Sequence, residues 1–261
     1  MTDPHHRFRQ AMTTFRAYPD TVSEIYDRRA HRKAQTREQI RTVGQGMFAA
    51  RGFEAVTIAD IAREAEVAVQ TVFNHFATKE EIFFDCRIPW VDGPADAVRF
   101  RAPGVPALSA LRIHLVSAVQ ELVGSHSTPQ RRCYLATLQA SDTLRTQERE
   151  LVHEAELRLS AALLEAWTAG SPPDRTAPDD PHSAAPLVAA TWVAASRALI
   201  HGRRPHLTEG ADPAQAAAAA AALAERVFGQ LEHNMVVAQA PVRRPAGGDT
   251  GWPHVVSRRA G

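Results

Sequence analysis

Lysine is almost absent from this sequence, because only Lys33 and Lys79 are lysines among its 30 basic residues. Cysteine is equally rare, and the two present, Cys86 and Cys133, exclude a disulfide framework and a cysteine-rich zinc motif. No run approaches the roughly 18 uninterrupted apolar residues of a transmembrane helix, and the N-terminus MTDPHHRFRQ leads into no apolar signal-peptide core. We therefore expect a cytoplasmic protein that does not cross a membrane.

An excess of one charge is also missing. The 30 basic residues face 29 acidic ones, and the formal net charge of +1 excludes a protein coated with positive charge for bulk binding of polyanions. Any nucleic-acid-binding surface must therefore be local. The strongest local positive field lies between Asp27 and Arg41, where six basic side chains oppose only two acidic ones.

Aromatic residues make up only 7% of the chain, and no alternating strand pattern bounded by turns stands out. Alanine and arginine are abundant instead, and both favour helices. The hydrophobic fraction of 44% allows a real core, and 261 residues suggest one or two domains. These features predict an all-α protein of about nine helices.

Prolines, glycines and capping residues divide the chain. We expect a partly disordered basic arm at residues 1–35 and a helix-turn-helix domain at 36–80, whose first helix begins at the capping pair Thr36 and Gln39. Segment 86–104, with its prolines and glycines, is the expected boundary region. A larger helical domain should occupy residues 81–237, with a loop at 170–183 and a disordered tail at 238–261.

Two short helices joined by a tight turn are indicated between Thr57 and His75. Thr57 and Asp60 form a capping pair that opens the first helix, and Glu66-Val67-Ala68 connects it to the second. A further pair, Thr78 and Glu81, opens the next helix. Two short helices braced by a third match a helix-turn-helix, whose second helix can enter a DNA major groove about 12 Å wide.

Residues 36–85 resemble the DNA-binding domain of TetR-family transcriptional regulators. Their sequence is TREQIRTVGQGMFAARGFEAVTIADIAREAEVAVQTVFNHFATKEEIFFD. The resemblance includes F-x-x-x-G-[FY] at the end of the first helix and T-[IV]-x-D-I-A in the second. It also includes T-[VL]-[FY]-x-H-F-x-[ST]-K-E-x-[IL] from the third helix into the fourth. The family implies a DNA-binding regulator that is not an enzyme, needs no cofactor and binds double-stranded DNA as a homodimer.

The resemblance assigns roles to individual residues. Gln70 and Asn74 would read bases, since amides can pair bidentately with adenine. Phosphate contacts would come from Thr57, Thr71, Phe73, His75 and Lys79. Simpler roles stay open beside these: Thr57 can act as a cap alone, His75 as a packed side chain and Lys79 as a solvated charge. The arm residues Arg28, Arg29, Arg32 and Lys33 would reach phosphates or an A·T-rich minor groove, or add only general attraction.

The sequence departs from the family pattern at the turn, where glycine, a hydrophobic residue and serine are usual. Glu66 must adopt a backbone conformation that glycine takes more easily, at a cost of roughly 1 kcal/mol. Ala68 removes the serine cap of the recognition helix, a loss of about 1 kcal/mol. These changes leave an alternative open, in which DNA binding is degenerate and the protein is a ligand-binding or interaction module.

The resemblance implies a ligand cavity and a dimer interface in the larger domain. Polar or aromatic side chains on apolar helix faces are the candidate ligand contacts, although such side chains are more often plain core: His114, Ser117, Tyr134, Trp167 and Trp192. The last two long helices carry the candidate dimer residues Ala194, Ala198, Leu223, Val227 and Leu231. Few charges lie on these faces, so the effector is expected to be small and largely apolar.

Enzyme motifs are incomplete. Gly44 to Ala49 fits G-x-G-x-x-A but lies inside an expected helix with no preceding strand, so we reject a dinucleotide site. His153-Glu154 begins like a zincin motif, but Leu157 stands where the second histidine is needed. No G-x-S-x-G occurs. The histidines are scattered, and we expect no metal site.

Overall fold

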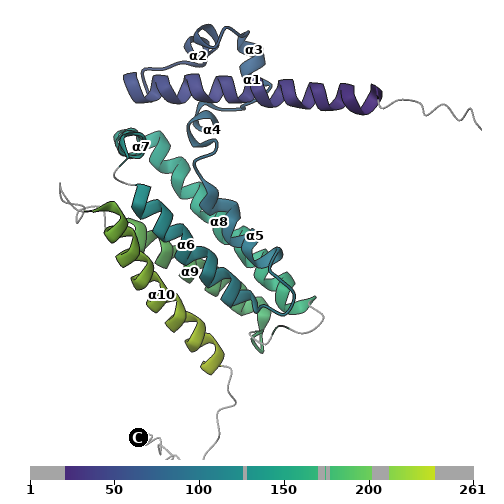
Figure 1. Cartoon of the computed structure of the whole chain (residues 1–261), viewed down its shortest axis with the longest axis vertical. Coiled ribbons are helices and arrows are strands. Elements are labelled where there is room, and N and C mark those ends of the chain that lie inside the picture. The colour runs from purple at the N-terminus through teal and green to yellow at the C-terminus, as the bar shows by residue number, and fades with distance from the viewer. Residues whose placement is uncertain (1–20, 126–127, 170–173, 175–176, 202–211, 239–261) are drawn as a thin grey trace, which may run out of the picture. The chain divides into compact units, whose positions relative to one another are not determined.

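The computed structural model of the chain describes residues 21–125, 128–169, 174, 177–201 and 212–238 (Figure 1). These residues form ten helices and no strand, which confirms the predicted all-α fold. In chain order the helices are α1 (Thr21–Arg51), α2 (Ile58–Glu64), α3 (Val69–Phe73), α4 (Lys79–Phe84), α5 (Pro89–Arg99), α6 (Ala107–Ser125), α7 (Pro129–Ala140), α8 (Asp142–Thr168), α9 (Pro181–His201) and α10 (Pro213–Ala238). The first 20 residues of the expected arm and residues 239–261 of the expected tail lie outside the described residues.

The chain divides into two compact units. The described parts of Met1–Ile88 and Pro129–Glu148 form the first unit, which holds α1 to α4, α7 and the start of α8. The described parts of Pro89–Thr128 and Arg149–Gly261 form the second unit, with α5, α6, the rest of α8, α9 and α10. The first unit thus includes more than residues 36–80, because α4 and α7 both pack on α1.

Helix α1 begins well before Thr36, so the predicted helix start at the pair Thr36 and Gln39 was wrong. The hydroxyl of Thr36 donates instead to the carbonyl of Arg32, one turn earlier in the same helix, at 3.0 Å. From Thr21 to Thr36 the sequence has no proline or glycine. Arginine, alanine, lysine and glutamine in this segment favour continuation of the helix, and one capping pair does not outweigh them.

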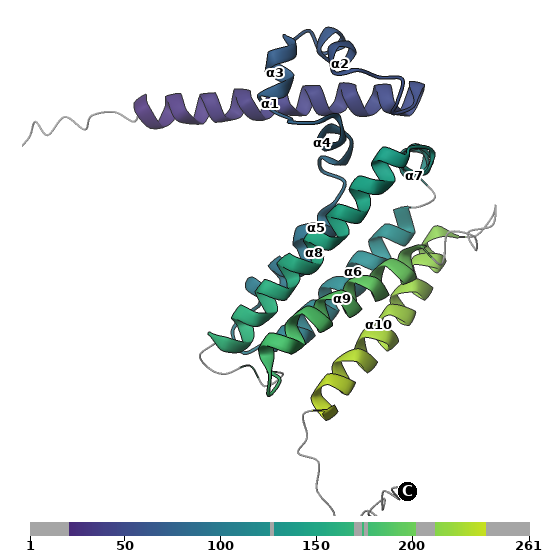
Figure 2. The same ribbon diagram turned by 180° about the vertical axis from the view of Figure 1, so that it is seen from behind.

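Within the first unit, α2 and α3 lie on one side of α1, and α4 and α7 on the other (Figures 1 and 2). Buried aromatic rings fill the inner space. Phe83 on α4 lies 6.0 Å from Phe53 and stacks on Tyr134 of α7 at 5.0 Å between ring centroids. Gly44 allows this close packing, since a Cβ there would lie 2.6 Å from Cγ2 of Ile82.

In the second unit, α5 and α10 both pack on α6. The core includes Trp192 of α9, which stacks on Phe228 of α10 at 5.2 Å. Arg112 on α6 forms ion pairs with two carboxylates of α10, Glu225 and, at 2.8 Å, Glu232. Aromatic stacking therefore joins α9 to α10, and charge pairing joins α6 to α10.

Helix α5 is the one helix, among those described, that the sequence did not predict, because segment 86–104 was expected to be a boundary. Pro89 stands in its first turn, where a missing N–H costs nothing. Val91, Pro94, Ala95 and Val98 recur at helical spacing and are buried. The segment was predicted to be a boundary because of its prolines and glycines, although its apolar residues have helical spacing. Gly93 completes the fit to α6, because a Cβ there would lie 2.8 Å from Nε2 of His114.

The segment before α9 is anchored by a buried carboxylate. Asp174 accepts a hydrogen bond from the backbone N–H of Ala107 at 2.7 Å, at the start of α6. Its carboxylate also lies 3.7 Å from the guanidinium of Arg101. The expected loop at 170–183 therefore fixes a helix start in the second unit, which composition alone did not indicate.

Helix α9 differs from the expectation that no segment could span a membrane. Among the described helices, its residues Pro181–Ile200 are long and apolar enough to do so by length and composition, with a mean hydropathy of 1.3. Polar residues such as Thr191, Ser196 and Arg197 interrupt this helix, so it contains no uninterrupted apolar run of that length. A core helix passes the same test, and Val188, Ala189 and Trp192 are buried in the core of the second unit.

Candidate nucleic-acid interface

Helix α3 presents one exposed face and one buried face. Val72 and, just beyond the helix, Phe76 are buried against the first unit. On the outer face, Gln70 and Asn74 are exposed, and the amide of Gln70 donates to Oδ1 of Asn74 at 3.3 Å. The structure therefore brings the two predicted base-reading side chains together on the surface.

Two apolar side chains share this exposed face. Val69 is 42% exposed and Phe73 is 48% exposed, which is unusual for residues of this size. Thr71 is half-buried. An apolar side chain at a major groove can contact the methyl group of thymine, so the face combines amide and apolar contacts. Phe73 was predicted from the sequence as a contact residue, whereas Val69 was not.

The turn before α3 has the predicted strain. Glu66 adopts a φ of 53°, in the left-handed region. It occupies the position after the end of α2 where helices commonly carry glycine, and Val67 donates to the carbonyl of Ala62 as in a Schellman motif. Ala68 begins α3 without a side-chain cap. Both departures from the family pattern thus affect the backbone as the sequence analysis predicted.

Thr57 caps α2 in a complete capping box. Its hydroxyl accepts from the N–H of Asp60 at 3.1 Å and donates to the carboxylate of Asp60 at 2.7 Å. The N–H of Thr57 donates to the same carboxylate at 3.1 Å. The Thr57 hydroxyl, its backbone N–H and Arg63 together lower the pKa of Asp60 to about 2. Since the hydroxyl and the N–H of Thr57 both donate to the carboxylate of Asp60, a phosphate could bind Thr57 only by replacing one of these two hydrogen bonds.

Lys79 lies at the start of α4, and its ammonium already has partners. It donates to the carbonyls of Phe53 at 3.0 Å and Val56 at 3.1 Å and lies 4.1 Å from the centroid of the Phe53 ring. An ammonium has three N–H donors, so one stays available for a phosphate. Lys79 therefore holds the segment between α1 and α2, and the predicted phosphate contact stays a prediction.

His75, just after α3, is half-buried, and its Nδ1 has no hydrogen-bond partner among the described residues. Burial lowers the pKa of His75, and the charges of Lys33 and Arg37 lower it further. The imidazole is therefore neutral at pH 7. A contact with a phosphate would use a neutral N–H donor and not a charge.

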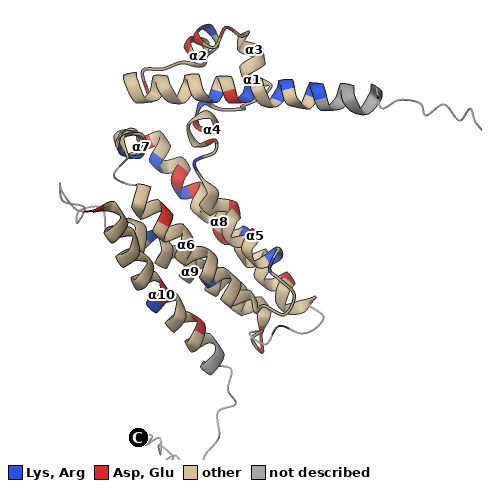
Figure 3. Ribbon diagram, in the orientation of Figure 1, with Lys and Arg blue, Asp and Glu red and all other residues tan. Residues whose placement is uncertain are grey.

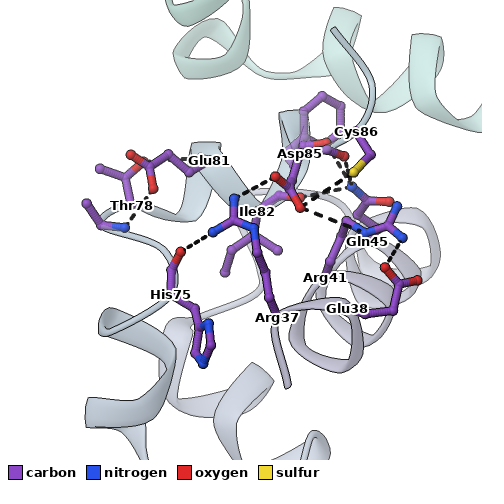
Figure 4. Close-up of polar contacts among 12 residues, drawn as sticks. Arg37, Glu38, Arg41, Gln45, His75, Thr78, Glu81, Ile82, Asp85 and Cys86 are labelled. Carbon is purple, nitrogen blue, oxygen red and sulfur yellow. Dashed lines mark hydrogen bonds and ion pairs between the residues drawn. The ribbon is translucent and has the colours of Figure 1, made fainter. Parts of the chain in front are cut away.

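The end of α4 is held to α1 by a polar network that the sequence analysis did not anticipate (Figure 4). The guanidinium of Arg37 lies 2.6 Å from the carboxylate of Asp85 and also donates to the carbonyl of His75. The amide of Gln45 donates to the carbonyls of Ile82 and Asp85, both at 3.0 Å. These bonds fix α3 and α4 relative to α1.

The basic segment of α1 divides into two groups. Arg37 and Arg41 pair with the carboxylates of Asp85 and Glu38, so their charges are neutralised inside the protein. The four predicted arm residues are exposed, and their spacing along α1 puts them on one face of the helix: Arg28, Arg29, Arg32 and Lys33. Figure 3 shows basic residues along this part of α1. The expected positive surface is therefore a helical stripe.

Two of the five candidate ligand contacts line one cavity in the second unit. His114 and Ser117 of α6 face a space of about 300 Å³ whose walls also include Trp90, Glu121 and Leu122. Burial lowers the pKa of His114, although Glu121 and Asp96 oppose the shift. We call this space the second-unit cavity. Most of its surface is apolar, although it also carries the polar side chains of His114, Ser117, Glu121 and Ser125.

The other three candidates lie elsewhere. Trp192 is packed in the core against Phe228, and Trp167 is buried in the same core, where its indole N–H has no partner among the described residues. Tyr134 belongs to the first unit, where it stacks on Phe83. These three side chains therefore do not share the second-unit cavity with His114 and Ser117.

The candidate dimer residues differ in exposure. Ala194 and Ala198 on α9 are exposed, and Leu187, on the same helical face, is 65% exposed. On α10 three candidates are half-buried: Leu223, Val227 and Leu231. The described chain thus leaves an apolar face of α9 uncovered. No group of three or more histidine, cysteine, aspartate or glutamate side chains that could hold a metal ion occurs in the described part of the chain.

Comparison with known proteins finds a family match within the first unit. Residues 40–86 match the model of the family described as bacterial regulatory proteins, tetR family. This is a family of regulatory proteins and not of enzymes, as predicted. No curated protein matches the chain.

Several solved structures are similar in fold. NalD of Pseudomonas aeruginosa, the secondary repressor of the MexAB-OprM multidrug efflux pump, is 22% identical over 75% of this chain and 96% of its own, with a TM-score of 0.46. SmeT of Stenotrophomonas maltophilia in complex with triclosan is 18% identical over 84% and 100%, also at 0.46. AlkX of Dietzia sp. is 20% identical over 76% and 95%, at 0.42.

Proposed function

Because this chain carries the N-terminal DNA-binding domain of the tetR family of bacterial regulatory proteins, we propose that it is a sequence-specific transcriptional repressor of the cytoplasm. The observation that carries the proposal is the exposed face of α3. Gln70 and Asn74 lie side by side there, and Val69 and Phe73 add apolar surface. A face with amide donors and acceptors beside apolar groups suits the edges of A·T base pairs in the major groove.

The regulator acts as a homodimer on a palindromic operator. Support comes from the exposed apolar face of α9 with Leu187, Ala194 and Ala198, which a second copy can cover by isologous pairing. Two copies would place their recognition helices one DNA turn apart, about 34 Å. The stripe of Arg28, Arg29, Arg32 and Lys33 then adds phosphate contacts on each half-site.

A small effector releases the repressor. The second-unit cavity, about 300 Å³ in volume, is of a size that holds a small molecule. Its apolar walls, with Trp90 and Leu122, favour a largely apolar ligand, and the side chains of His114 and Glu121 offer polar contacts. An effector that binds one conformation more tightly shifts the population toward it, and the loss of DNA affinity equals that difference.

A second candidate function is a ligand-binding or interaction module with degenerate DNA binding. The strained Glu66 and the uncapped start of α3 at Ala68 favour it. Both weaken the recognition helix without removing the exposed side chains. The salt dependence of DNA binding separates the two functions.

The test is the affinity of the full chain for mixed-sequence duplex DNA at about 50 and 200 mM salt. A repressor dimer with six to ten phosphate contacts should lose about 10³- to 10⁵-fold in affinity over this range. A degenerate domain should show weak binding with almost no salt dependence. The second result would exclude the repressor and leave the ligand-binding module.

A further inference from the structure

A second cavity, of about 270 Å³, lies inside the first unit between α1, α4 and α7. We call it the α1–α4–α7 cavity. It is built entirely from first-unit residues and shares none with the second-unit cavity. Its walls include Gln45, Gly46, Phe83, Arg87, Cys133 and Tyr134.

Arg87 is the unusual member of this lining. Its half-buried guanidinium lies 5.1 Å from the ring centroid of Tyr134 and 5.4 Å from that of Phe83, and its closest acceptor is the carbonyl of Phe83 at 3.5 Å. No carboxylate of the described residues forms an ion pair with it. The nearby carboxylate of Asp85 pairs with Arg37 and Arg41 instead.

A second guanidinium lies close by. Arg131 on α7 is 4.7 Å from the ring centroid of Tyr134. Burial lowers the pKa of Arg87, and the positive charge of Arg131 lowers it further. The partly desolvated guanidinium of Arg87, beside the positive charge of Arg131, makes this cavity attractive to an anion, because a cation that has lost its water is costly unless an anion compensates it.

We propose that the α1–α4–α7 cavity binds a small aromatic carboxylate. The guanidinium of Arg87 offers parallel N–H donors that match the two oxygens of a carboxylate. The stacked rings of Phe83 and Tyr134 form an apolar wall for a planar ring. This ligand differs in charge from the largely apolar effector of the second-unit cavity.

The cavity is joined directly to the elements that position the DNA-binding helices. Gln45 lines it, and the same amide donates to the carbonyls at the end of α4 (Figure 4). A bound carboxylate can compete for the Gln45 amide and so alter the hold of α1 on α4. The effect on DNA affinity rests on the proposed function, whereas the binding site itself does not.

The experiment is equilibrium dialysis of the full chain with 1-naphthoate, and with the neutral 1-naphthamide as the matched ligand. Wild type should bind the acid with a Kd below about 1 mM and the amide at least about tenfold more weakly. Arg87→Gln should weaken binding of the acid about tenfold. Arg51→Gln, an exposed arginine at the end of α1, is the control and should leave binding unchanged.

A second variant, Gly46→Leu, blocks the cavity while keeping both guanidinium groups. A Cβ at Gly46 has no atom within 4 Å, and leucine favours a helix, so the chain should fold and lose binding. Alkylation of the two cysteines by iodoacetamide, followed by mass spectrometry, locates the ligand. Naphthoate should protect Cys133, which lines the cavity, and not the exposed Cys86.

Equal binding of acid and amide, unchanged binding by Arg87→Gln or Gly46→Leu, or no binding by wild type would each overturn the proposal. DNA affinity is measured separately with and without naphthoate. If the chain binds naphthoate through Arg87 but binds no DNA, the proposed function is refuted and the proposed ligand site is supported. If the chain binds DNA but not naphthoate, only the proposed ligand site is refuted.

Discussion

Arg37 and Asp85 are 48 residues apart in the chain, and their side chains meet at 2.6 Å. The same guanidinium donates to the carbonyl of His75 and lies 4.0 Å from the ring centroid of Phe76. One side chain of α1 therefore contacts both the segment that follows α3 and the end of α4. This contact separates the structural basic residues of α1 from those that can face DNA.

Replacing Arg37 by glutamine should lower the free energy of unfolding and should leave the salt dependence of DNA binding nearly unchanged. The pair is partly exposed, so we expect a loss of about 1 kcal/mol in the free energy of unfolding. The position of α3 should also become less fixed, and DNA affinity should fall at every salt concentration. Urea unfolding and DNA titrations measure the two effects. An unchanged unfolding midpoint would show that the Arg37–Asp85 pair does not hold the unit together.

The basic stripe of α1 should behave in the opposite way. Replacing all four of its residues, Arg28, Arg29, Arg32 and Lys33, by glutamine should leave stability nearly unchanged, because they are exposed. The salt slope of DNA binding should fall by about one for each lost phosphate contact. A slope equal to that of wild type would mean that the stripe does not touch DNA.

Gly44 and Gly46 lie two residues apart on α1 but should respond differently to alanine. A Cβ at Gly44 would meet Ile82 at 2.6 Å, so Gly44→Ala should destabilise by about 1–3 kcal/mol through overpacking. Gly46 has open space around it, and Gly46→Ala should stabilise by about 1 kcal/mol through helix propensity. Thermal unfolding of the two variants provides the comparison, and a shift of the same sign in both would refute it.

The turn before the recognition helix can be restored to the family pattern. Glu66→Gly relieves a positive φ and should stabilise by about 1 kcal/mol. Ala68→Ser supplies the missing cap of α3 and should add about 1 kcal/mol. If the turn limits DNA binding, the double variant should also bind DNA more tightly than wild type. No gain in stability from either change would contradict the observed geometry.

His114 should make stability depend on pH. Burial lowers its pKa below the ordinary value of 6.5, so the unfolded chain takes up the proton first as pH falls. The free energy of unfolding should therefore decline as pH drops below about 6.5 and level off below the folded-state pKa. His114→Gln should reduce this decline, as measured by urea unfolding at several pH values. The pKa of His75 is also lowered, so part of the decline in the free energy of unfolding should remain in the His114→Gln variant.

Much of the fold followed from local sequence signals. The capping box of Thr57 and Asp60, the positive φ of Glu66 and the bare start of α3 at Ala68 all depend on neighbouring residues, and the structure confirms them. Helix α5 and the upstream part of α1 were missed. In those segments a proline count and a single capping pair were weighted above periodicity and helix propensity.

The site was less accessible to sequence reasoning because its contacts are long-range. Gln70 and Asn74 share a face by helical spacing, which a sequence shows directly. The partners of Lys79, by contrast, are carbonyls more than 20 residues away, and Arg87 meets Tyr134 from another helix. The local sequence does not distinguish a lysine that donates to backbone carbonyls of the same chain from one that is available to bind a phosphate.

The most direct test of the regulator is selection of bound sequences from random duplex DNA by the full chain, with and without 1-naphthoate. We predict enrichment of a two-fold palindrome whose half-sites lie about one helical turn apart. Gln70→Ala and Asn74→Ala should then change the preferred bases within each half-site. No enriched sequence under either condition would contradict the account and leave the ligand-binding module as the function of this chain.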